Sequence, residues 1–289
     1  MILAKAIRPI PLILSGLTYL LGAGMARYFT GAFQTRSFWL GLIWVGLIQS
    51  ATFLLLDYFC SPTSYVDSDE TTIQREKRKT ITIQITAALM AIAAAITVMM
   101  LILEAGNTSA YILMVFIFGL FASYAVPPLQ TVYSGYGELT LAIVWANLIP
   151  ALGFMLQHDE IHRYLPMATF PLTLLALAYL LVGGFAGYAS DQKFRRSSLV
   201  IRLTWQRAIV LHHFLVVIAF LLYGLAPLVG MSWTLVWPVF LSIPFAVAQI
   251  YLMQKISKGG RVTWKLMLFL ASSVFGLTSY LLTFTFWIR

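Results

Sequence analysis

Two groups of acidic residues in this chain could bind a divalent cation, and both lie beside basic residues. Asp57 stands at the end of an apolar run, and Asp67, Asp69 and Glu70 follow it in a polar stretch. A basic cluster comes directly after them, at residues 75–79. A carboxylate at the end of a membrane-spanning run is costly unless water, a cation or a metal ion stabilises it. These acids are therefore candidates for a site, although a side chain that reaches interfacial water would explain Asp57 equally well.

The second acidic position is Asp191, which lies in a polar stretch at about 187–207. The bases of that stretch that could reach a phosphate group are Lys193, Arg195, Arg196 and Arg202. Carboxylate oxygens are ligands that Mg²⁺ prefers, and Mg²⁺ commonly bridges them to diphosphate oxygens. Basic side chains would bind the remaining phosphate charge, and the set would stabilise a departing diphosphate. Membrane topology alone would explain Arg195 and Arg196 equally well.

The composition requires a membrane protein. The 289 residues are 60% hydrophobic and only 10% charged, and the mean hydropathy is +0.86. Such a chain has little polar surface to offer water, so it must cross a bilayer as helices or as a closed barrel. The apolar runs are continuous and do not alternate at every second residue, which favours helices. We therefore expect an all-α, polytopic membrane protein.

Nine apolar runs are long enough to cross a bilayer. We place them at about 10–30, 37–58, 80–103, 109–127, 138–157, 166–187, 205–226, 230–253 and 265–287. We expect one domain over 1–289, with the helices bundled around a central cavity that opens to the cytoplasm. Two long cytoplasmic loops, at about 58–80 and 187–207, would cap that cavity. If spans one to four and five to eight form similar halves, these loops face each other across it.

The basic residues predict the orientation. With the N-terminus in the cytoplasm, 15 of the 19 Lys and Arg residues fall in inside segments. This asymmetry follows the positive-inside rule. It predicts an integral protein of a bacterial-type plasma membrane, with a cytoplasmic N-terminus and a C-terminus outside. Orientation and anionic lipid headgroups account for the net charge of +9, so no nucleic acid partner is expected.

Four segments of the chain resemble the motifs of one family, in the same order. They are Ala6-Ile7-Arg8-Pro9; Asp57-Tyr58-Phe59 followed by Asp67; Tyr124-Ala125-Val126-Pro127-Pro128-Leu129 followed by Gly135-Tyr136-Gly137-Glu138; and Asp191 with Ser198-Leu199-Val200-Ile201-Arg202-Leu203. The chain thereby resembles the UbiA-type intramembrane prenyltransferases, most closely the 1,4-dihydroxy-2-naphthoate (menaquinone) branch. The segments are similar to that family's opening segment, first aspartate motif, proline-rich loop with its Gly-x-Gly-Glu segment, and second aspartate motif.

The resemblance implies which residues act. The catalytic residues would be Asp57, Asp67 and Asp191. A Mg²⁺ ion would be held by Asp57, Asp67, Asp69 and Asp191. The diphosphate would be bound by Lys193, Arg195, Arg196 and Arg202. The aspartate motifs are degenerate, because Leu56 replaces an Asn of the family pattern and Cys60 and Gly187 each replace an Asp.

The resulting function hypothesis is transfer of a polyprenyl group from a prenyl diphosphate to an aromatic, quinone-precursor-type acceptor. The missing carboxylates keep a second hypothesis open. In that case the chain has lost turnover and binds a quinone, an isoprenoid lipid or a pigment, for example as a subunit of a larger membrane complex. A transporter fits less well, because the spans contain few charges that could couple ion movement. For Glu138, at the start of a span, a structural role at a helix N-terminus is favoured.

Overall fold

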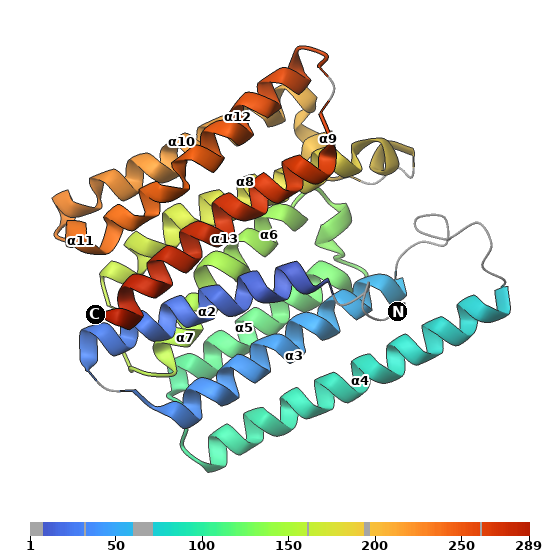
Figure 1. Ribbon diagram of the computed structural model, residues 1–289. Helices are drawn as coiled ribbons and strands as arrows, with labels where there is room; N and C mark the ends of the chain where they lie inside the picture. The colour runs from blue at the N-terminus through green and yellow to red at the C-terminus, as the bar shows by residue number, and fades with distance from the viewer. Residues whose placement is uncertain (1–7, 32, 60–71, 161, 194–196, 261) are drawn as a thin grey trace.

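The computed structural model describes residues 8–31, 33–59, 72–160, 162–193, 197–260 and 262–289. Within these ranges every regular element is a helix, and one isolated bridge joins Ser134 and Ser197. Nine segments of this part are long and apolar enough to cross a bilayer (Figure 1). The expectation of an all-α, polytopic membrane fold with about nine spans is confirmed.

The spanning segments follow the predicted order. They are α2 (Pro9–Thr30), α3 (Thr35–Phe59), α4 (Thr72–Ile102), α5 (Thr108–Ala125), the composite of α6 (Gly137–Ile143), the π-helix η2 (Val144–Leu148) and α7 (Ile149–Met155), α8 (Tyr164–Lys193), α10 (Trp205–Leu225) with η3 (Ala226–Val229), the composite of α11 (Trp233–Val236), η4 (Trp237–Ser242) and α12 (Ile243–Ser257), and α13 (Trp264–Ile288). Two short helices, η1 (Thr131–Tyr133) and α9 (Leu199–Leu203), lie in connections between spans.

The bounds predicted for the two long loops, 58–80 and 187–207, are wrong at their ends. Helix α4 begins at Thr72, and α8 continues to Lys193, so Asp191 lies on a helix. Neither 72–79 nor 188–193 contains Gly or Pro, and both are rich in residues that tolerate a helix. Hydropathy marks where a helix leaves the membrane, whereas the helix ends only where the backbone pattern is broken.

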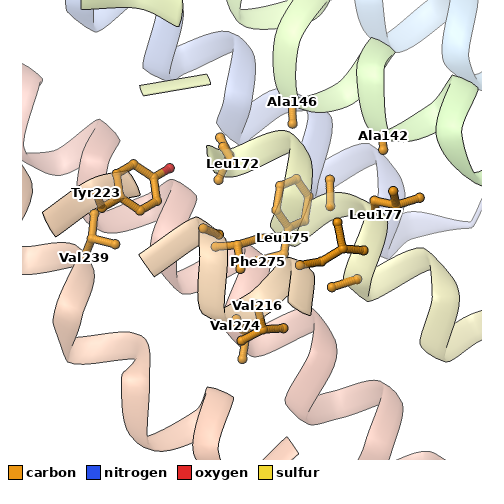
Figure 2. Close-up of a cluster of buried hydrophobic side chains, with 14 of the residues drawn as sticks. Ala142, Ala146, Leu172, Leu175, Leu177, Val216, Tyr223, Val239, Val274 and Phe275 are labelled. Carbon is orange, nitrogen blue, oxygen red and sulfur yellow. The ribbon is translucent and has the colours of Figure 1, made fainter. Parts of the chain in front are cut away.

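The helices pack around two hydrophobic clusters. One joins α8, α10 and α13 and includes the buried side chains of Leu172, Val216 and Phe275 (Figure 2). The other joins α3, α5 and the α6–α7 composite. Helix α2 touches α7 backbone to backbone, because a Cβ on Gly22 would clash with the backbone of Pro150. Small residues permit such close approach inside a membrane.

The bundle has two unlike ends. The charged end carries Arg8, Asp57, Arg78 and Asp191, and the opposite end carries the connections from α2 to α3, from α4 to α5 and from α7 to α8. At the opposite end, Asn107 caps α5 by accepting a 2.6 Å hydrogen bond from the Ala110 backbone N–H. The Asn107 side chain also donates to the Met155 carbonyl at 2.8 Å and to Asp159 at 2.9 Å. The Asn107 amide therefore fastens these connections together.

Candidate functional site

Asp57 lies in the last turn of α3, at the charged end. Its Oδ2 accepts a 3.1 Å hydrogen bond from Nη1 of Arg78, near the start of α4. About a third of the Asp57 side chain and a quarter of the Arg78 side chain are exposed, so the pair contributes about 0–1 kcal/mol to stability. One residue further on, the Lys79 Nζ lies 5.7 Å from the centre of the Tyr58 ring. The pair's main effect is to hold a carboxylate and a cation side by side.

Arg8 places a further cation beside α3. Its guanidinium lies 5.4 Å from the centre of the Phe53 ring, and Phe53 precedes Asp57 by one turn on the same face of α3. The same guanidinium interacts electrostatically with the Tyr179 hydroxyl of α8. Arg8 is exposed and has a left-handed φ of 48°, directly before Pro9 begins α2. Arg8 therefore lies against α3, and its charge also acts on Tyr179 of α8.

Helix α8 also carries Asp191, about three turns after Tyr179. Tyr179, Gly183, Gly187 and Asp191 follow one another at intervals of four residues, so each lies beside the next in a row that turns about 120° around the helix. A Cβ on Gly187 would lie 3.7 Å from Asp191 Oδ2, which shows that the carboxylate lies back along this row. A Cβ on Gly183 would meet no atom within 4 Å. The row thus borders open space at Gly183.

Glu138 fixes the segment that follows Asp191. Its Oε1 accepts a 3.1 Å hydrogen bond from the Leu199 backbone N–H at the start of α9. Its Oε2 is buried and has no hydrogen-bond partner in the part of the chain described here. Glu138 and Asp191 also interact electrostatically, so two carboxylates lie near each other at the charged end. The structural role expected for Glu138 is present, in the first turn of α6.

Arg202 joins α9 to the loop before α6. Its Nη1 donates a 3.1 Å hydrogen bond to the Ser134 carbonyl, and its guanidinium lies 4.3 Å from the centre of the Tyr136 ring. Gly135 between them has a φ of 80°, and a Cβ there would lie only 3.0 Å from Arg202 Cδ. Glycine at this position permits the close approach. Arg202 therefore holds two connections together, and its role toward a diphosphate stays a prediction.

Of the other predicted site residues, the structure describes Lys193 alone. Lys193 is the last residue of α8. Asp67, Asp69, Glu70, Arg195 and Arg196 lie outside the described residues.

The described acids do not by themselves form a cluster for the predicted Mg²⁺ ion. Over residues 72–160, 162–193 and the other described ranges, no three His, Cys, Asp or Glu side chains converge as a metal ion would require. Mg²⁺ is commonly bound by one or two carboxylates together with water and substrate phosphate oxygens. Asp57 and Asp191 therefore suit a site that the diphosphate completes, and a site made of protein carboxylates alone would need further acids.

Sequence reasoning did not select Arg8 as a site residue. It entered only as part of the opening segment that resembles the family's and of the inside basic charge. The adjacent Pro9 is the signal that could have identified it. Proline favours the first turn of a helix, so the residue before it lies at the helix N-terminus. The contact with Phe53, however, joins residues 45 positions apart, and no local sequence pattern predicts such a contact.

The fold is shared with known structures. A UbiA homologue from Archaeoglobus fulgidus bound to GPP and Mg²⁺ is 16% identical, with a TM-score of 0.69 over 99% of each chain. The same homologue bound to DMAPP and Mg²⁺ is 16% identical, with a TM-score of 0.70 over 99% of this chain and 98% of that one. A structure described for digeranylgeranylglyceryl phosphate synthase is 15% identical, with a TM-score of 0.59 over 100% and 98%. No family model and no curated protein matches the sequence. The similarity establishes a UbiA-type fold over the whole length.

Proposed function

We propose that this chain is a membrane prenyltransferase of the UbiA type, which transfers a polyprenyl group to an aromatic, quinone-precursor-type acceptor. The observation that carries the proposal is the full-length similarity to structures that hold GPP or DMAPP with Mg²⁺. The charged end adds support, because the exposed cation Arg8 lies beside α3 one turn from Asp57, and its charge also acts on α8, the helix that carries Asp191. Binding of GPP and DMAPP by those neighbours is a property of the neighbours, and its extension to this chain is the proposal.

The proposed reaction begins with the diphosphate of the donor at the charged end. Arg8 and Lys193, together with the bases at 195 and 196, would bind its oxygens and stabilise the charge that grows as it leaves. The allylic C–O bond breaks, and its electron pair departs with the diphosphate. An electron-rich carbon of the acceptor ring, such as that of a dihydroxynaphthoate, forms the new C–C bond. The ring then loses one proton, for which Asp191 is the proposed acceptor.

The proposal also covers the domain organisation, the membrane orientation and the catalytic residues of the chain. The chain forms one domain over 1–289, and the charged end with its basic residues faces the cytoplasm, so the N-terminus is inside and the C-terminus outside. Asp57, Asp67 and Asp191 are the proposed catalytic residues. The proposed Mg²⁺ ligands are Asp57, Asp67, Asp69 and Asp191, since the described carboxylates form no group of three by themselves.

The proposal is tested with membranes containing the full chain, radiolabelled geranylgeranyl diphosphate and a panel of quinone-precursor acceptors. We expect release of diphosphate and a labelled, organic-soluble product, both lost in Asp57→Ala and Asp191→Ala. Asp67→Ala and addition of a chelator test the metal. If both leave the wild-type rate intact, the proposed Mg²⁺ site does not exist.

A second candidate function is binding without turnover. It is favoured by the ion pair that already occupies Asp57 and by the glycines at 183, 184 and 187, where the family's second aspartate motif has polar residues. The chain would then hold an isoprenoid lipid, a quinone or a pigment, as a subunit of a membrane complex. Saturable binding of geranylgeranyl diphosphate with no release of diphosphate for any acceptor would identify this function.

A further inference from the structure

The acidic residues of this chain are confined to one part of the sequence. All ten Asp and Glu residues lie between Asp57 and Asp191. From residue 192 to residue 289 the sequence contains ten Lys and Arg residues and no acid. The positive-inside rule accounts for the position of the bases, but acids contribute little to membrane orientation, so the rule does not account for their absence. The absence of acids from the last third of the chain therefore needs another explanation.

Four of these bases lie exposed at the charged end of the bundle, and we call them the basic patch. Arg207 lies in the first turn of α10, Lys255 in the last turn of α12, Lys258 directly after α12, and Lys265 in the first turn of α13. These helix ends lie at the same end of the bundle as α9 (Figure 1). Because the four bases come from three helices, the patch is a feature of the folded chain.

Two tryptophans join the parts of the patch on α10 and α13. The rings of Trp205 and Trp264 meet edge to face, with 6.2 Å between their centres. Arg207 follows Trp205 by two residues, and Lys265 follows Trp264 directly. Tryptophan is enriched at the level of the lipid headgroups, where its ring and its N–H group are both accommodated. The two bases therefore lie at the depth of lipid phosphate groups.

The end of α12 brings the other two bases of the patch close to the start of α13. The Gly260 backbone N–H donates to the Lys255 carbonyl at 2.9 Å, and a Cβ on Gly260 would lie 2.6 Å from Lys255 Cγ. The turn thus folds back along the Lys255 side chain. The connection between α12 and α13 covers only residues 258–263, so Lys258 begins it and Lys265 follows it closely.

Helix stability accounts for only half of the patch. A cation is favourable at the C-terminal end of a helix, which is where Lys255 and Lys258 lie. Arg207 and Lys265 lie instead in first turns, where the helix dipole favours an acid, and neither first turn contains one. In these two positions the cation gains nothing from its own helix. An anion from outside the protein would stabilise all four bases.

We propose that the basic patch binds anionic phospholipids of the surrounding bilayer through their phosphate groups. Bases next to a membrane surface are attracted to anionic headgroups, and the attraction grows with the number of bases. The tryptophans favour a lipid over a free phosphate ion, because their rings contact the region of the lipid beside the phosphate. The patch is separate from the residues proposed for the reaction, so this inference does not depend on the proposed function.

The test is a titration of the purified full chain in detergent with phosphatidylglycerol, which is anionic, and with phosphatidylcholine, which is zwitterionic. Native mass spectrometry measures the lipid-bound fraction and gives an apparent Kd. Two double variants, Arg207→Gln/Lys265→Gln and Lys255→Gln/Lys258→Gln, each remove two charges from the patch. Their melting temperatures without added lipid should match that of the wild type, which shows that they are folded.

The matched control is Arg36→Gln/Arg289→Gln. Both residues are exposed, and they lie at the start of α3 and at the end of α13, at the opposite end of the bundle. The control therefore changes the net charge by the same amount and leaves the patch intact.

We expect each patch variant to bind phosphatidylglycerol at least about tenfold more weakly than the wild type, because two bases near a membrane surface are lost. The control should bind it as the wild type does, and added salt should weaken wild-type binding. Equal affinity of the wild type for the two lipids, or equal losses in the control and the patch variants, would overturn the proposal. Displacement of phosphatidylglycerol by inorganic diphosphate would also overturn it, because it would show a site for a free anion.

Discussion

The two ends of the bundle are held together in different ways. At the opposite end, amide side chains make several of the ties: Asn107 donates to two backbone carbonyls and to Asp159, and the Gln157 side chain accepts a 2.7 Å hydrogen bond from the Gln34 backbone. At the charged end, ionisable side chains make the corresponding ties: the Asp57–Arg78 pair, Glu138 on the Leu199 N–H, and Arg202 on its carbonyl and ring. Charged groups at a membrane surface are hydrated and contribute little to stability.

The difference between the two ends indicates that one end mainly stabilises the fold and the other mainly binds a ligand. A neutral bond between backbone and amide stabilises the fold whether or not a ligand is present. An exposed cation such as Arg8, held near a ring and a tyrosine hydroxyl, contributes little to the fold but can bind an anion strongly. Substitutions at the charged end should therefore change catalysis more than stability, and substitutions at the opposite end should do the reverse.

The largest expected effect is on the acids. Asp57→Asn and Asp191→Asn should lower the rate of prenyl transfer at least about 100-fold, because each removes a charge from the reacting end. Their melting temperatures in detergent should change little, since the Asp57 ion pair is part-exposed. Asp159→Asn is the matched control at the opposite end. A rate loss in Asp159→Asn as large as in the other two variants would contradict the claim that the charged end alone carries catalysis.

The next effect is on the cations. Arg8→Gln should raise the KM for the prenyl diphosphate about tenfold or more, as expected for loss of a charged hydrogen bond. Arg27→Gln is its control, because Arg27 also lies over an aromatic ring, at 5.3 Å from the centre of Trp287, but near the opposite end. Steady-state kinetics on both variants gives the answer. Equal KM values for Arg8→Gln and wild type would remove Arg8 from the site.

Asn107→Ala should show the reverse pattern. It removes the cap of α5 and three donated hydrogen bonds, so we expect a loss of about 1–2 kcal/mol in stability. Thermal unfolding followed by tryptophan fluorescence measures this loss. The kcat and KM of the folded fraction should match those of the wild type. A changed KM with an unchanged melting temperature would show that the opposite end takes part in catalysis.

The smallest effect concerns pH at the opposite end. The His162 ring stacks on Phe29 with 4.1 Å between ring centres. Burial, followed by the nearby Arg163 and His158, lowers the pKa of His162 below its ordinary value of 6.5. The unfolded chain then binds the proton more readily, so stability is present above that value and is lost as the pH falls below it. The melting temperature should therefore fall between about pH 7.5 and about pH 5.5.

His162→Phe keeps a ring against Phe29 but cannot take up a proton. Its melting temperature should depend less on pH than that of the wild type, while the pH profile of turnover stays the same. If the two proteins lose stability equally over this range, groups other than His162 account for the wild-type loss.

The sequence predicted the spans because each one needs about 20 apolar residues, and composition reports that directly. It did not predict the π-helix η2, which lies just before Pro150, because hydropathy carries no information on hydrogen-bond register. Pro150 has no N–H to donate, and this relaxes the helical pattern around it. The acids were found from their charge in an apolar chain. Arg8 was missed as a site residue, because its position depends on Phe53 and Tyr179, which are distant in sequence.

The most direct test is a structure of the full chain with a geranyl diphosphate analogue in which sulfur replaces the bridging oxygen, so that the donor binds and does not react. The account predicts the diphosphate within hydrogen-bond distance of Arg8, between the faces of α3 and α8 that carry Asp57 and Asp191. A diphosphate bound at the opposite end of the bundle, or at the charged end but away from α3 and α8, would contradict it.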